Sequence, residues 1–154
     1  MDTRSEKHLS TLLPEVQANF RAFVTEAQAL AASKGYEYKV ICGTRDWDEQ
    51  ARLYAQGRTA PGKIVTKAPP GSSFHNFGLA IDCGVFRGGK YLDEDEPITA
   101  AKFHRLVAPL AKARNLRWGG DFKSIVDMPH FEFNTPVGLA ELRSRRQREV
   151  ALLG

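Results

Sequence analysis

The sequence predicts a single α+β domain with a small antiparallel sheet. Long stretches with apolar residues every three or four positions are interleaved with short runs in which apolar and polar residues alternate. The chain has 154 residues, and 42% of them are hydrophobic, which is enough for one core. Because neither internal repeats nor a linker is present, we expect residues 1–154 to form one domain with a basic helix or tail at 136–154.

The first half of the chain contains two predicted helices and one strand. In order, the pattern indicates a helix at 14–34, a strand at 36–42, a helix at 47–56 and a loop at 58–72. Pro14 suits the first turn of its helix, and Gly35 suits the position after the last turn. In the strand, Tyr38, Val40 and Cys42 are expected to share one face.

The second half of the chain contains two predicted strands and two predicted helices. We expect a strand at 79–86, a helix at 99–115 kinked near Pro109, a loop at 117–129, a strand at 130–133 and a final helix. Thr135 is the expected N-cap of that last helix, followed by Pro136.

Charge and composition exclude several classes of protein. The formal net charge is +4, and the hexapeptide at 143–148 carries four arginines, so the rest of the chain is about neutral. No nucleic-acid-binding motif is present, and we expect no nucleic-acid partner. No apolar run approaches roughly 18 residues and no secretory leader is recognised, so we expect synthesis in a cytoplasm without membrane insertion. The basic tail is a candidate for contact with an anionic surface, although a solvated terminal helix is the alternative.

Two histidines and an aspartate are candidate metal ligands. In the strand at 79–86, Asp82 lies on the face opposite Ile81 and Cys83, and His130 alternates with buried-type Phe131 in its own strand. If the two apolar faces pack on one core, Asp82 and His130 project together from the other side of the sheet, and His75 enters from the preceding turn. Two imidazoles and one carboxylate are typical of a catalytic zinc site, which leaves one position open. Ordinary hydrogen-bonded surface groups are the alternative interpretation.

A second carboxylate lies close by in the sequence. Asp127 stands three residues before His130, where it can accept a proton from a water molecule without being a ligand. By contrast, His8 and His104 are expected to be solvated or structural, and both cysteines are expected to be small buried thiols.

Two sequence motifs strengthen this interpretation by resemblance. Residues 73–82, SFHNFGLAID, match the pattern S-x-H-x-x-G-x-A-x-D, and residues 127–130, DMPH, match D-x-x-H. Together they resemble the zinc D,D- and L,D-peptidase superfamily (peptidase family M15). Residues 41–91 and 116–132 resemble its phage L-alanyl-D-glutamate endopeptidase branch. The resemblance implies a D-Ala-D-Ala carboxypeptidase/hedgehog-like fold, with helices on one face of the sheet and the metal site on the other.

The resemblance also implies roles for individual residues. It implies Zn²⁺ as the cofactor and the following site: metal ligands His75, Asp82 and His130, catalytic Asp127 and Arg45, and substrate-binding Arg45 and Ser73. A surface salt bridge of Arg45 with Asp46 or Asp48 is the alternative for the arginine. A turn-capping hydroxyl is the alternative for Ser73.

The function implied is that of an endolysin. Such an enzyme hydrolyses the L-alanyl-D-glutamate bond of the peptidoglycan stem peptide, waits in the cytoplasm of the infected host, and acts in the periplasm after release. We expect a monomer. Two alternatives stay open: a D-alanyl-D-alanine carboxypeptidase on the same scaffold, and a non-catalytic wall-binding module.

Overall fold

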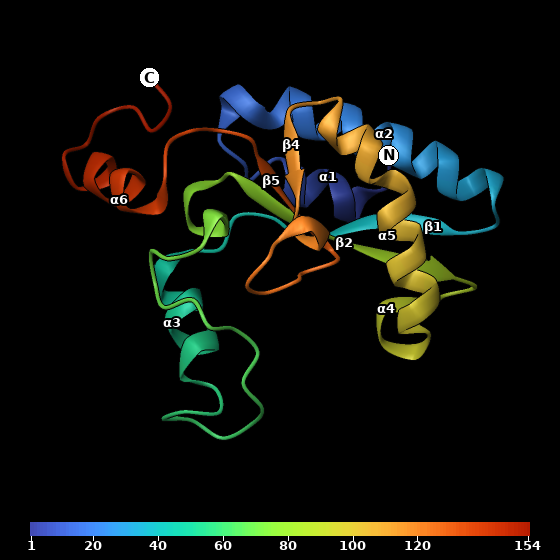
Figure 1. Cartoon of the computed structure of the whole chain (residues 1–154), viewed down its shortest axis with the longest axis horizontal. Helices are drawn as coiled ribbons and strands as arrows, with labels where there is room; N and C mark the ends of the chain where they lie inside the picture. Colours follow the sequence, from blue (N-terminus) through green and yellow to red (C-terminus); the bar gives the residue numbers. More distant parts are fainter.

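The strand-type runs of the sequence assemble into one antiparallel sheet of five strands (Figure 1). The computed structural model describes all residues, 1–154. Four strands pair in the order β1 (Glu37–Cys42), β2 (Ala80–Arg87), β5 (His130–Phe133) and β4 (Leu116–Trp118), and β3 (Lys90–Tyr91) pairs with β2. The predicted α+β class with an antiparallel sheet is therefore confirmed.

Six α-helices and three short 3₁₀ turns surround this sheet. The helices are α1 (Thr3–Leu9), α2 (Gln17–Ser33), α3 (Trp47–Ala55), α4 (Leu92–Asp95), α5 (Pro97–Lys112) and α6 (Leu139–Gln147). The 3₁₀ turns are η1 (Pro14–Val16), η2 (Phe74–Phe77) and η3 (Gly119–Asp121). Figure 1 shows α3 and the loop after it extending away from the sheet and from α2 and α5. No helix combines the length and the apolar content that crossing a membrane requires.

The hydrophobic core lies between one face of the sheet and the long helices α2 and α5. Phe23 of α2 packs on Phe131 of β5, with ring centroids 4.6 Å apart, and Phe103 of α5 packs on Tyr38 of β1 at 5.2 Å. Ile81 of β2 is fully buried in the same cluster. Since alternate strand residues point to opposite faces, Asp82 and His130 are left on the face away from these helices, as predicted.

Two helix predictions were wrong in detail. The helix α5 runs from Pro97 to Lys112 with Pro109 inside it, so it begins two residues and ends three residues earlier than predicted. The last helix begins at Leu139 with Gly138 as N-cap, so Thr135 does not cap it. Instead, the Thr135 hydroxyl accepts a hydrogen bond from the Val137 amide and closes a turn before the helix.

His104 is buried and structural, which is one of the two alternatives expected for it, and it is not solvated. Its two ring nitrogens contact the Tyr38 hydroxyl and the Asp93 carboxylate. Asp93 also accepts a hydrogen bond from the Val85 amide at 2.7 Å. His104 thus joins α5 to α4 and the sheet, and the helical pattern around it did not reveal partners from other elements.

Candidate functional site

Strand register places three chemically active side chains in one row across the sheet. His130 of β5 is opposite Asp82 of β2, and Asp82 is opposite Cys42 of β1. The pairing of β1 with β2 shifts between Val40 and Cys42, which is a β-bulge. The bulge turns Cys42 towards Asp82, so the prediction that Cys42 shares the core face with Val40 was wrong, and its thiol is only partly buried.

His75 reaches the same row from the turn before β2. It lies in η2, and Gly78 ends that turn with φ 70°, a left-handed conformation that favours glycine. A Cβ at Gly78 would also lie 2.7 Å from the Leu13 backbone nitrogen. The chain can therefore reverse sharply here and bring His75 back over Asp82.

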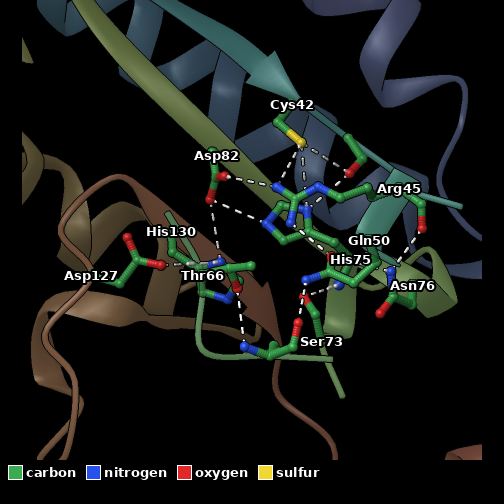
Figure 2. A network of polar contacts seen from close by, with 12 residues as sticks. Cys42, Arg45, Gln50, Thr66, Ser73, His75, Asn76, Asp82, Asp127 and His130 are labelled. Carbon is green, nitrogen blue, oxygen red and sulfur yellow. Dashed lines mark hydrogen bonds and ion pairs between the residues drawn. The ribbon is translucent and has the colours of Figure 1, made fainter. Parts of the chain in front are cut away.

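The two histidines meet at one carboxylate oxygen (Figure 2). His75 Nε2 lies 3.2 Å and His130 Nδ1 lies 3.3 Å from Asp82 Oδ1. The two imidazole rings lie 5.1 Å apart, centroid to centroid. The structure thus brings together the three side chains that the sequence suggested as metal ligands.

In each histidine, the ring nitrogen that points away from Asp82 has a partner that can only accept a hydrogen bond. His75 Nδ1–H donates to the Gly43 carbonyl oxygen at 2.8 Å, and His130 Nε2–H donates to Glu132 Oε1 at 2.8 Å. The nitrogens that face Asp82 are therefore free to take up a further proton or a metal ion. Partners of this kind orient histidine ligands at metal sites.

Electrostatics favour positive charge between these side chains. Burial alone lowers the pKa of His75, but the Asp82 carboxylate outweighs this effect and raises that pKa to about 10. Burial likewise raises the pKa of Asp82, but His75 and His130 together hold it far below its usual range. The site is thus built to keep a cation beside the carboxylate.

The donor set fits a divalent metal such as zinc. Tetrahedral bonds of about 2.0–2.1 Å place neighbouring ligand atoms about 3.3–3.4 Å apart, close to the distance of each histidine nitrogen from Asp82 Oδ1. Asp82 joins two overlapping groups of possible ligands, one with His75 and Cys42 and one with His130 and Asp127, and in each group the donor atoms lie within 4.8 Å of one another. His75 and His130 do not fall into one group of possible ligands, so Asp82 is the ligand that links them. Two imidazoles with one carboxylate leave a fourth position open, as catalytic zinc requires.

Asp127 lies beside this group on the loop before β5. Its Oδ2 is 3.9 Å from His130 Nδ1, and its side chain is half-exposed. Gly119 makes this approach possible, because a Cβ there would lie 2.2 Å from the Asp127 carbonyl oxygen. Burial raises the pKa of Asp127, which brings the carboxylate closer to the range of a proton shuttle.

Arg45 points into the site rather than towards its neighbours in sequence. One guanidinium nitrogen donates to Gln50 Oε1 at 2.9 Å, and the other lies 3.9 Å from Asp82 Oδ2 and 3.4 Å from Cys42 Sγ. Asp46 instead caps α3 through the Glu49 amide, so the suggested salt bridge with that residue is not formed.

Gln50 supports the site from the core, and Glu132 is a site residue that the sequence did not identify. Gln50 is fully buried and also donates to the Ala68 carbonyl oxygen at 2.8 Å, so one amide holds both Arg45 and the loop after α3. Glu132 lies two residues after His130 on the same strand face. That alternation was visible in the sequence, although the contact was not.

All six predicted site residues line one cleft of about 820 Å³: Arg45, Ser73, His75, Asp82, Asp127 and His130. The Ser73 hydroxyl accepts a hydrogen bond from the His75 amide at 3.2 Å, so it caps the turn while facing the cleft. Its role towards a substrate stays a prediction.

Comparison with known proteins agrees with this geometry. A family model described as D-alanyl-D-alanine carboxypeptidase, of the peptidase M15 group, matches residues 66–133. Peptidoglycan L-alanyl-D-glutamate endopeptidase CwlK of Bacillus subtilis (strain 168) is 38% identical over 127 residues, which cover 80% of this chain and 74% of CwlK.

Solved structures share the fold. L-Ala D-Glu endopeptidase ChiX of Serratia marcescens superposes with a TM-score of 0.58 at 20% identity, covering 86% of this chain and 88% of ChiX. DacB from Streptococcus pneumoniae D39 superposes with a TM-score of 0.51 at 20% identity, covering 96% of this chain and 78% of DacB. Fold and site define a metallopeptidase. The chain belongs to peptidase family M15, which confirms the resemblance inferred from the two motifs.

Proposed function

We propose that this protein is a zinc-dependent peptidoglycan peptidase that hydrolyses the L-alanyl-D-glutamate bond of the stem peptide. The observation that carries the proposal is the meeting of His75 and His130 at Asp82, with Asp127 beside them in one cleft. The choice of bond is supported by the similarity to CwlK over most of both chains.

The chain's own residues would divide the chemistry between them. His75, Asp82 and His130 would hold Zn²⁺, which when bound polarises a carbonyl group and acidifies water. Asp127 accepts the proton of the attacking water and delivers it to the nitrogen of the leaving amine. Arg45, held by Gln50, presents positive charge to the oxygen on which negative charge develops.

Mass spectrometry of digested peptidoglycan tests the proposal. Purified peptidoglycan treated with the protein should release peptides with a new N-terminal D-glutamate. A chelator should abolish their release, and added zinc should restore it. An Asp127→Asn protein at the same concentration is the matched control and should release almost none. Cleavage that persists in the chelator would contradict the metal-dependent mechanism.

A D-alanyl-D-alanine carboxypeptidase is the second candidate. The description of the matching family model favours it. The same digestion separates the two activities, because a carboxypeptidase releases free D-alanine and leaves the L-alanyl-D-glutamate bond intact. D-alanine as the sole product would replace the endopeptidase proposal with this one.

A non-catalytic wall-binding module is the remaining alternative. The position of Asp127 next to two of the three candidate ligands, Asp82 and His130, supports hydrolysis over binding alone. An Asp127→Ala protein that keeps its zinc and still clears cells would favour the binding module.

We further propose that the peptidase serves as a phage endolysin, kept in the host cytoplasm until it is released to the wall. The support is the resemblance of residues 41–91 and 116–132 to the phage branch of the family. Expression in a Gram-negative host should cause lysis only after the inner membrane is permeabilised, and Asp127→Asn should prevent it. Intact cells after permeabilisation, with active enzyme present, would argue against this role.

A further inference from the structure

The loop after α3 forms a wall of the cleft and carries unbalanced positive charge. Between Gln50 and Ile81 the chain has no acidic residue and four basic ones: Arg52, Arg58, Lys63 and Lys67. Of these four, Lys67 alone lines the cleft that holds the candidate metal ligands. Its side chain is exposed and takes part in none of the ion pairs of the structure.

The other cation of the cleft is already engaged. Arg45 donates to Gln50 and lies near Asp82, as described above. Three acidic side chains line the cleft: Asp82 faces the two histidines, Asp127 lies 3.9 Å from His130, and Glu132 is bound by His130 and by Arg117 at 2.8 Å. None of these carboxylates forms an ion pair with Lys67, so Lys67 is the lysine or arginine of the cleft that has no acidic partner within the chain.

Both neighbours of Lys67 are fixed by hydrogen bonds. The Ala68 carbonyl oxygen accepts from the buried Gln50 side chain at 2.8 Å, and the Ala68 amide donates to Thr66 Oγ1 at 3.1 Å. Figure 2 shows Thr66 among the residues of the site. The backbone around Lys67 is thus tied to the residue that holds Arg45, although the loop has no regular secondary structure.

Exposed apolar side chains from two loops also line the cleft. Four of the eight large hydrophobic residues that are exposed line this cleft: Ile64 and Val65 on the loop after α3, and Ile125 and Val126 on the loop before β5. A ligand between these two loops removes water from them, and the lower local dielectric strengthens any ion pair formed at Lys67.

We propose that Lys67 and these two apolar loops form a substrate subsite, in which Lys67 pairs with a free carboxylate of the substrate peptide. The proposal rests on the peptidoglycan peptidase function proposed above. Lys67 is a specificity residue in this scheme: it selects carboxylated over amidated peptides, whereas bond cleavage depends on the residues around Asp82.

Steady-state kinetics on two peptides tests this subsite. The probes are L-alanyl-γ-D-glutamyl-L-lysine with free carboxyl groups and the same peptide with those groups amidated. Wild-type protein should show a lower KM for the free acid. Lys67→Met should reduce that preference about tenfold through KM, with little change in kcat on the free acid, and Lys67→Arg should retain it.

Lys63→Met is the matched control, because Lys63 is an exposed lysine of the same loop that does not line the cleft. Full preference for the free acid in Lys67→Met would overturn the subsite. An equal loss in Lys63→Met would also overturn it, since that result indicates a general attraction of the loop for anionic polymers. Failure of wild-type protein to cleave either peptide or purified peptidoglycan would instead contradict the proposed function, so the two failures are distinguishable.

Discussion

Replacing Glu132 by glutamine tests whether the partner of His130 tunes the metal site. Glu132 accepts two hydrogen bonds, from His130 Nε2 and from Arg117, both at 2.8 Å. A glutamine of the same size has one accepting oxygen and one donating nitrogen. In either orientation of the amide, its NH₂ group therefore faces a donor, either His130 Nε2–H or the Arg117 guanidinium, and that hydrogen bond is lost.

The structure sets the size of this effect. The side chains of His130 and Glu132 are only 8% and 12% exposed, so water replaces the lost acceptor poorly. Hydrogen bonds to charged groups contribute about 1.5–3 kcal/mol. Loss of the outer partner of a histidine ligand typically weakens metal binding about 10–100-fold, or about 1.4–2.8 kcal/mol. We expect Glu132→Gln to weaken zinc binding within that range.

Competition with a chromophoric chelator measures the zinc affinity directly, without reference to activity. Glu26→Gln is the matched control, because Glu26 pairs with Arg114 at the surface, away from the site. Equal zinc affinity of Glu132→Gln and wild-type protein would refute the reasoning. An equal loss in Glu26→Gln would show that the effect is not local.

Three further predictions concern the catalytic loop and the core. Asp127→Asn should lower kcat on peptidoglycan fragments about 10²–10⁴-fold, with zinc affinity almost unchanged, because its carboxylate moves a proton and is not a ligand. Gly119→Ala should lower kcat about 10²-fold, since its Cβ would lie 2.2 Å from the Asp127 carbonyl oxygen. Gly138→Ala, where a Cβ meets nothing within 4 Å, should retain wild-type kcat. Phe131→Ala should reduce the free energy of unfolding by about 3–5 kcal/mol in urea titrations, whereas exposed Ile98→Ala should change it by less than about 0.5 kcal/mol.

The candidate ligands could be found from the sequence because each lies on a short element with a clear pattern. Alternation in two strands put Asp82 and His130 on polar faces, and the turn before the first of these strands brought His75 towards them. Glu132 could have been found by the same alternation. The hydrogen bonds of Gln50 could not be found, because its partners Arg45 and Ala68 come from two different loops, and helical periodicity shows only that a residue faces inward.

The sequence by itself determined the fold class, most of the helices and strands, and the polar face on which the site is built. These follow from neighbours a few residues apart, whose spacing decides which side of an element is buried. Only the tertiary structure decided that Cys42 faces Asp82, that His104 is buried against Asp93, and that Lys67 is left without a counter-charge in the cleft. Those outcomes depend on strand register, a bulge and loop packing, and these are set by contacts between distant segments that no local pattern encodes.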